Sequence, residues 1–278
     1  MSKNKPQLVD GINNVSNSTY HADRNYLSSS VLKTIYKSLD QYYLEYVMGK
    51  KKEIGKELQA VFDYGTLAHS YILEPESVHK DFNFYPGFRK QGKEYEAYLE
   101  NLVNPNLPVI SASQKAQVND LIKAYDKHPV APSLITGGFA EHTICGQLHG
   151  VPIKVRTDYI NADKGYIVDV KTTSYPSEKE SFTMTVDQLS YHLSAALYTA
   201  MAEQYYGKPF DFYFLVLSKK DKTCDVFKLS SAKMEAGKRM VQEACSKYVK
   251  AKASGIWTEP SFIEQELETQ TDYIIEEI

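Results

Sequence analysis

Two aspartates and a lysine occupy a stretch of the chain, residues 151–173, whose pattern predicts a β-hairpin. The polar segment 161–165 ends in a glycine and is typical of a turn between two strands. Asp158 precedes this turn, and Asp169 and Lys171 follow it. Since successive side chains of a strand point to opposite faces, Asp169 and Lys171 share one face of the second strand.

Alternation along the first strand separates charged from uncharged side chains. One face is predicted to carry Lys154, Arg156 and Asp158, and the other Ile153, Val155, Thr157 and Tyr159. Asp158 therefore points away from the apolar face.

The register of the hairpin decides how close the two aspartates lie. A turn centred between Asp163 and Lys164 places Asp158 directly opposite Asp169. Cross-strand neighbours have Cβ atoms about 4.5–5.5 Å apart, and like charges placed there destabilise a sheet unless something offsets them. A divalent cation is the natural offset. The alternative is a bulge at Gly165, which would shift the register by one residue.

This arrangement suits the hydrolysis of a phosphodiester. Carboxylate oxygens are the ligands that Mg²⁺ prefers, and a bound ion lowers the pKa of its water and stabilises developing negative charge. A pair of ions can hold the attacking and the leaving oxygen. Lys171 can orient or deprotonate the water, and its ammonium offsets charge in the transition state. The bare Asp-X-Lys pattern is common by chance, so its structural surroundings matter.

The rest of the chain predicts the elements that would position the hairpin. Helices are expected from Ser28 to about 48, and over about 55–73, 113–126, 186–205 and 230–253, with strands over 139–146, 212–218 and 224–229. The stretch 82–108 is expected to be a loop. The order of helices, three strands, a helix, two strands and a terminal helix predicts an α/β or α+β fold around a mixed sheet.

The two ends of the chain differ from its middle. Residues 1–26 have few apolar positions and are expected to form a flexible arm, whereas 27–262 are expected to form a single domain. Residues 263–278 carry acidic side chains and no Lys or Arg. They form either a solvated acidic end or a segment that contacts a basic neighbour or repels DNA.

Several single residues allow both a structural and a functional interpretation. His69 lies inside the second predicted helix, where a histidine is more often a core or surface residue than a metal ligand. Glu141 lies on the strand before the hairpin and either faces the site or is solvated. Arg89 and Lys93 either belong to a solvated loop or contact backbone phosphates.

Composition narrows the class of protein. The chain has 278 residues, 42% hydrophobic and 24% charged, with a net charge of −3. Overall basicity is therefore absent, although a local basic groove would suffice to bind DNA. Three cysteines without paired spacing indicate neither disulfides nor a zinc or iron–sulfur site. No apolar run is long enough to span a membrane, and no signal peptide is apparent, so a cytoplasmic protein is expected.

From about Tyr26 to Tyr206 the sequence resembles the stand-alone RecE-type (exodeoxyribonuclease VIII) branch of the PD-(D/E)XK nucleases. The matching stretches are Y-L-S-S-S-V-L-K, G-T-L-A-H-S-Y-I-L-E-P-E, F-R-K-Q-G-K-E-Y, K-V-R-T-D, I-V-D-V-K-T-T and Y-H-L-S-A-A-L-Y. The most specific are G-T-L-A-H with L-E-P-E, and the acidic pair that ends in D-V-K-T-T. The predicted element order also contains the αβββαβ core of this superfamily, with added N-terminal helices and a long C-terminal helix.

The resemblance assigns roles by position. It implies that His69, Asp158 and Asp169 are metal ligands and that Lys171 is the catalytic lysine. The helix after the hairpin usually shows Gln-x-x-x-Tyr in this family, and here it reads Ser194 to Tyr198. The contact that the glutamine makes is therefore in doubt.

The full set of expected site residues is larger. Further metal ligands are the backbone carbonyl of Val170 and the side chain of Glu141, and DNA contacts are expected from Arg89, Lys93, Arg156, Tyr191, Ser194 and Tyr198.

The function that the resemblance implies is Mg²⁺-dependent digestion of one strand of linear duplex DNA from its end. The expected direction is 5′ to 3′, leaving 3′ single strands for recombination, with two ions per site and Mn²⁺ as a substitute. Such enzymes form closed rings, here a trimer or tetramer, and phages and prophages pair them with a single-strand annealing protein in the bacterial cytoplasm. The alternatives are an endonuclease of the same superfamily and a catalytically silent DNA-binding scaffold for recombination.

Overall fold

The computed structural model describes residues 8–50 and 55–258. Its centre is a mixed six-stranded sheet with the order β1-β4-β5-β6-β7-β8, in which β6 and β7 are parallel and the other neighbours are antiparallel. The strands are β1 (Gly11–Asn13), β4 (Phe139–Leu148), β5 (Val151–Asn161), β6 (Tyr166–Thr173), β7 (Asp211–Ser218) and β8 (Thr223–Lys228). This is the mixed α/β architecture that the predicted element order indicated.

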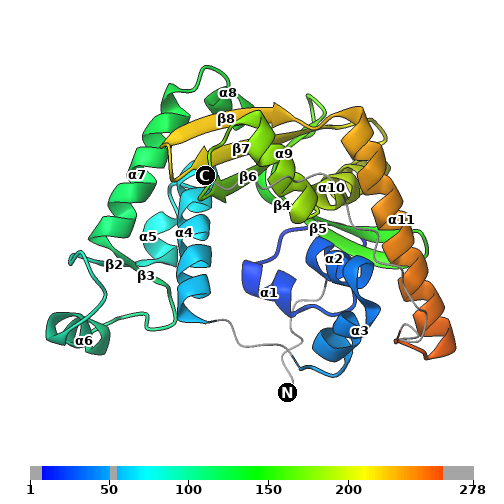
Figure 1. Cartoon of the computed structure of the whole chain (residues 1–278), viewed down its shortest axis with the longest axis horizontal. Coiled ribbons are helices and arrows are strands. Elements are labelled where there is room, and N and C mark those ends of the chain that lie inside the picture. Colours follow the sequence, from blue (N-terminus) through cyan, green and yellow to red (C-terminus); the bar gives the residue numbers. More distant parts are fainter. Residues whose placement is uncertain (1–7, 51–54, 259–278) are drawn as a thin grey trace, which may run out of the picture.

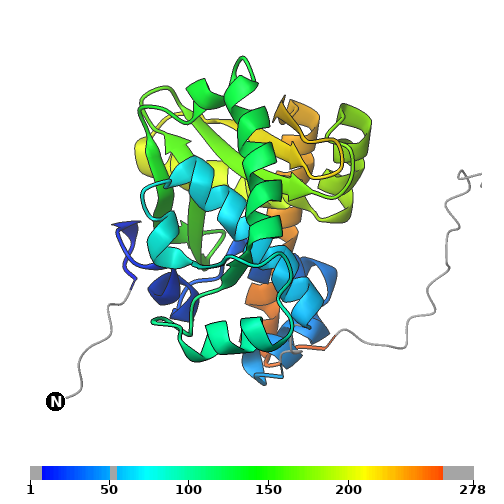
Figure 2. The same ribbon diagram turned by 90° about the vertical axis from the view of Figure 1, so that its left-hand side faces the viewer.

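Helices cover the two faces of the sheet (Figures 1 and 2). One face packs against α4 (Lys56–Leu73) and α7 (Ala112–Lys127), and the other packs against α2 (Ser29–Lys37), α10 (Tyr191–Tyr206) and α11 (Ser231–Ser254). The shorter helices are α1 (Asn17–Ala22), α3 (Leu39–Tyr42), α5 (Val78–Asp81), α6 (Lys93–Glu100), α8 (Ala131–Leu134) and α9 (Lys179–Gln188).

The hairpin of β5 and β6 has the predicted register. Tyr159 pairs with Val168 and Asn161 with Tyr166, which centres the turn between Asp163 and Lys164. Gly165 adopts a φ of +72°, a conformation open to glycine, and no bulge shifts the strands.

The predicted apolar face of β5 is not continuous. Ile153 and Val155 pack in the core on the α2, α10 and α11 side, whereas Tyr159 packs in the core on the α4 and α7 side. The strand therefore changes sides between Val155 and Tyr159, so the predicted alternation is wrong across this interval. The ladder between β4 and β5 is also interrupted there, at Glu141 and Asp158.

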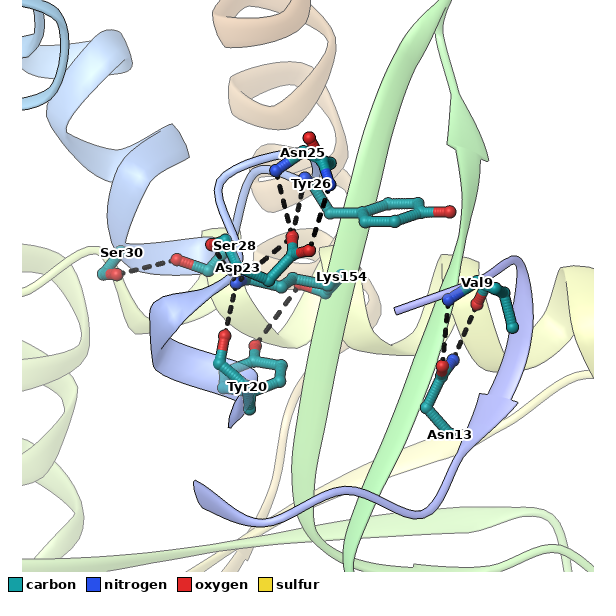
Figure 3. Close-up of polar contacts among 9 residues, drawn as sticks. All are labelled: Val9, Asn13, Tyr20, Asp23, Asn25, Tyr26, Ser28, Ser30 and Lys154. Atoms are coloured by element: carbon teal, nitrogen blue, oxygen red, sulfur yellow. Dashed lines mark hydrogen bonds and ion pairs between the residues drawn. The ribbon is translucent and has the colours of Figure 1, made fainter. Parts of the chain in front are cut away.

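Residues 8–26 do not form the flexible arm expected for residues 1–26. β1 pairs with β4, and α1 is capped by Ser16 and anchored to β5. The Lys154 ammonium donates hydrogen bonds to the carbonyls of Tyr20 at 2.5 Å and Asp23 at 2.8 Å (Figure 3). Because these contacts come from a strand far along the chain, local composition gives no sign of them.

Two other predicted elements differ from the structure. The helix expected from Ser28 to about residue 48 breaks at Ser38, which has a φ of −160° and caps α3; a π-helical turn (Tyr43–Val47) follows. The loop expected over 82–108 contains α6 and β2 (Asn83–Tyr85), which pairs in parallel with β3 (Val109–Ser111).

Two further predictions concern the ends of the chain and the absence of a membrane-spanning segment. The predicted acidic end, 263–278, lies outside the described residues, and so do residues 1–7 of the arm. Within the part of the chain that is described, no helix combines the length and the apolar character that crossing a membrane requires.

Candidate active site

Three carboxylates form a row across neighbouring strands. Glu141 on β4 lies at the level of Asp158 on β5, because Ala140 pairs with Tyr159 in the same register. The register of β5 and β6 continues to Asp158 and Asp169. Neither pair belongs to a ladder, which is expected where like charges oppose each other in a sheet.

Glu141 is the most strained member of the row. Its φ is +48°, a left-handed conformation that residues other than glycine rarely adopt and that occurs often at functional sites. Burial, and then the nearby Asp158 carboxylate, raise the pKa of Glu141 to about 7, against the opposing effect of Arg156. The negative charge of Glu141 is therefore disfavoured unless a cation lies nearby.

His69 reaches the row from α4. The neighbouring Leu67 and Ala68 are fully buried against the sheet, which fixes the helix and directs His69 towards β5. Its Nδ1 lies 3.5 Å from Asp158 Oδ2. His69, for which the helix pattern favoured a structural role, thus lies next to Asp158, a predicted metal ligand.

His69, Glu141 and Asp158 form a group that fits a metal ion. One ligand atom from each lies within 4.8 Å of the others, and all three side chains are partly buried. Ligands bound to one ion at about 2.0–2.6 Å are separated by at most about 4–5 Å, so these atoms can share one ion. Two carboxylate oxygens suit Mg²⁺, and an imidazole nitrogen suits a transition metal such as Mn²⁺.

Asp158 is held in place by the neighbouring strand. Its Oδ2 accepts a hydrogen bond of 2.7 Å from the backbone N–H of Val170. The carbonyl of Val170, expected to be a metal ligand, accepts a 3.4 Å hydrogen bond from the Lys171 ammonium. The structure thus brings this carbonyl to the site, and its role as a ligand remains a prediction.

Asp169 and Lys171 form an ion pair beside the metal-ligand group. Asp169 is buried and lies outside that group, while the Lys171 ammonium donates to its Oδ2. Burial raises the pKa of Asp169, and Lys171 opposes this effect. For Lys171, burial lowers the pKa, but the carboxylates of Asp169 and Asp158 outweigh this effect and raise it. Lys171 is therefore held in its charged form.

The predicted tyrosines of α10 border this ion pair. The Lys171 Nζ lies 5.1 Å from the centroid of the Tyr191 ring, and the Tyr198 hydroxyl lies 3.2 Å from Ser29 Oγ on α2. Ser194, between the two tyrosines on α10, is buried.

Lys33 is a site neighbour to which the sequence assigned no role, although it ends the matching stretch Y-L-S-S-S-V-L-K. Its Nζ lies 5.0 Å from the centroid of the Tyr191 ring that Lys171 also contacts. Its spacing of four residues from Ser29 places both on one face of α2. No pattern in the sequence indicates that this face packs on α10.

The basic residues expected to contact DNA are dispersed. Arg156 donates from Nε to Thr143 Oγ1 at 2.8 Å and from Nη2 to the Val15 carbonyl at 2.8 Å, so the chain itself occupies its donors. Arg89 and Lys93 are exposed at α6, which lies far from the sheet in both views (Figures 1 and 2). Arg89 and Lys93 therefore do not adjoin the metal-ligand residues, whereas Arg156 is near enough to Glu141 to lower its pKa.

A cavity of about 260 Å³ lies between the N-terminal segment and α2. It is lined by Tyr20, Arg24, Ser28 and Lys154, among others, and by none of the three metal-ligand residues. The metal-ligand residues therefore lie outside this cavity.

Comparisons with known proteins agree with this fold. A crystal structure of a candidate exonuclease from Eubacterium rectale superimposes with a TM-score of 0.61 at 16% identity, covering 87% of each chain. A phage-related exonuclease from Haemophilus somnus 129PT matches with a TM-score of 0.36 at 12% identity, covering 83% of this chain and 96% of the other, a likeness too low to carry an argument. No curated protein matches the sequence.

A family model covers most of the chain. The model described as a PDDEXK-like domain of unknown function (DUF3799) matches residues 28–262. These residues include α4, β4, the hairpin and α10, and therefore every member of the metal-ligand group and the ion pair. The chain belongs to the DUF3799 family of PDDEXK-like domains.

Proposed function

We propose that this protein is a metal-dependent DNA nuclease whose site comprises His69, Glu141, Asp158, Asp169 and Lys171. The observation that carries the proposal is the metal-ligand group, which places two carboxylates and an imidazole within 4.8 Å of one another beside a buried lysine. A purely structural sheet gains nothing from three carboxylates in a row, because like charges opposed across strands destabilise it.

The residues of the site divide the chemistry between them. His69, Glu141 and Asp158 would hold the ion, which when bound would supply an activated water and positive charge at the phosphorus. Asp169 orients the Lys171 ammonium through their ion pair. Because its carboxylate neighbours keep Lys171 charged, the lysine orients the attacking water and stabilises negative charge on the phosphate oxygens.

The proposed substrate is the end of linear duplex DNA. One strand is digested 5′ to 3′ with Mg²⁺, or with Mn²⁺ in its place, leaving a 3′ single strand for recombination. A second ion shared by Asp158, Asp169 and the Val170 carbonyl belongs to this proposal. The proposal also includes a trimeric or tetrameric ring around DNA and a single-strand annealing partner. The proposed place of action is the cytoplasm of a bacterium that carries the phage or prophage. These details rest on the resemblance of the sequence to RecE-type enzymes.

The test compares linear with covalently closed duplex, each incubated with Mg²⁺ or with EDTA. Labels at the 5′ or the 3′ end of linear duplex report the direction, with and without a 5′ phosphate. We expect digestion of linear duplex alone, in Mg²⁺ alone, with early release of the 5′ label. Cutting of closed circles would establish an endonuclease, and the absence of cutting of either substrate with Mg²⁺ would leave a silent scaffold.

A further inference from the structure

Helix α2 brings a second lysine to the candidate site. The Nζ atoms of Lys33 and Lys171 lie 5.0 Å and 5.1 Å from the centroid of the same Tyr191 ring, so they are at most about 10 Å apart. One turn before Lys33, Ser29 contacts the Tyr198 hydroxyl, and this contact fixes the face of α2 that points to α10. The position of the Lys33 ammonium is thus set by packing between helices.

Lys33 is partly buried and lacks the partners that buried cations usually have. Among the described residues, no carboxylate or carbonyl accepts a hydrogen bond from its Nζ, and its one close neighbour is an aromatic ring. Burial, and then repulsion by Lys171, lower the pKa of Lys33 to about 8, while Asp169 opposes this effect. A cation that is withdrawn from water without a hydrogen-bonded anion destabilises a fold, so an anion from outside the chain would stabilise Lys33 in this position.

We propose that Lys33 binds a backbone phosphate of the DNA, next to the phosphate that Lys171 faces. The inference rests on the proposed nuclease function and adds a positioning residue to it. Asp169 holds the ammonium of Lys171 at the cut. The ammonium of Lys33 has no such anchor and is free to pair with a neighbouring phosphate of the same strand. A phosphate there would give Lys33 the anion that the chain does not supply.

The experiment measures digestion of an end-labelled linear duplex by wild type, Lys33→Met, Lys33→Arg and Lys37→Met between 50 and 200 mM salt. Lys37 is the matched control, because it lies one turn further along α2 and is exposed, with its Nζ 3.5 Å from the Gln188 carbonyl. For Lys33→Met we expect a KM raised about 10-fold and a salt slope of log(kcat/KM) reduced by about one. Lys33→Arg should retain most of the wild-type value, and Lys37→Met should match wild type.

Binding separates this inference from the nuclease proposal. Affinity for duplex ends is measured with Ca²⁺ in place of Mg²⁺, so that it does not depend on turnover. Weaker binding by Lys33→Met than by Lys37→Met, with a thermal unfolding midpoint no lower than that of wild type, supports the inference even if wild type cuts nothing. Equal binding and equal salt slopes for the two variants would overturn it while leaving digestion by wild type intact. A wild type that neither cuts nor binds DNA would overturn both proposals.

Discussion

The charged side chains of β5 form two regions with opposite properties. At one end, Lys154 donates to the carbonyls of Tyr20 and Asp23, and Arg156 donates to the N-terminal segment and to β4. At the other end, Asp158 accepts one backbone hydrogen bond and otherwise faces a histidine and further carboxylates. The cations thus contact acceptors within the chain, whereas the carboxylates of Asp158 and Glu141 lie next to each other.

This difference separates residues that stabilise the fold from residues that need a ligand. Burial lowers the pKa of Lys154, and the Asp23 carboxylate partly offsets that effect. Arg156 offsets the burial of Glu141 only in part, so the pKa of Glu141 is still raised, and its backbone is strained as well. The basic end of β5 is therefore complete as it stands, whereas under the proposed function a metal ion would complete the acidic end.

The largest expected effect comes from Lys171→Ala. This change removes the charge that the site aligns through Asp169, and we expect the rate of DNA hydrolysis to fall by about 10³-fold or more. Binding of duplex ends should persist, because the other cations remain. Single-turnover digestion with Mg²⁺, alongside end binding with Ca²⁺, checks both expectations. A variant that cuts at the wild-type rate would contradict the assignment of Lys171.

Much of the hairpin was predictable because its signals are local. The turn composition and strand length place Asp158 opposite Asp169, and the structure has this register. The pattern did not show that β5 changes sides between Val155 and Tyr159, where its ladder with β4 is interrupted opposite Glu141, whose backbone is strained. The strand pattern therefore favoured neither a solvated nor a site-facing Glu141, although its side chain lies within the metal-ligand group.

Contacts between distant segments were not predictable. The N-terminal segment 8–26 has few apolar residues, yet it is anchored by Lys154, more than a hundred residues away. Lys33 lies in a helix whose sequence indicates only an amphipathic surface. Each position follows from the packing of one element on another, which propensity and periodicity do not encode. His69 was identified through the resemblance, since the helix pattern alone favoured a structural role.

The second prediction tests whether the acidic end requires a metal ion. Glu141→Gln removes one ligand charge and should weaken Mn²⁺ binding by about 10- to 100-fold, as measured by isothermal titration calorimetry. In EDTA the same variant should unfold at an equal or higher temperature than wild type, because it no longer buries a disfavoured charge. Unchanged Mn²⁺ affinity would remove Glu141 from the metal-ligand group.

The third prediction addresses the basic end. Lys154→Met leaves the carbonyls of Tyr20 and Asp23 buried without their donor, and we expect the free energy of unfolding to fall by about 2 kcal/mol. Mn²⁺ affinity should remain at the wild-type value, because Lys154 contacts none of the metal-ligand residues. Urea denaturation and calorimetry measure the two quantities on one preparation. A variant of unchanged stability but lost metal binding would reverse the roles assigned to the two ends of β5.

The smallest expected effect is a difference between Lys33 and Lys154 in how substitution by Met changes the stability of the fold at different pH values. The pKa of Lys33 in the fold is about 8, below its ordinary value of 10.5, so the unfolded chain binds more protons between these values. Charged Lys33 thus destabilises the fold at pH below about 8, and this destabilisation disappears as the pH rises towards 10.5. The charged and titratable neighbours of Lys33 are Lys171, Asp169, Lys37 and Tyr191. Lys33→Met should therefore be more stable than wild type by about 1–2 kcal/mol at pH 7 and equal to it near pH 10. Urea denaturation at both pH values tests this difference, with Lys154→Met as the counterpart that loses stability at pH 7. A loss of stability in Lys33→Met at pH 7 would mean that the chain itself supplies the partner of Lys33, and the contrast between the two lysines would then fail.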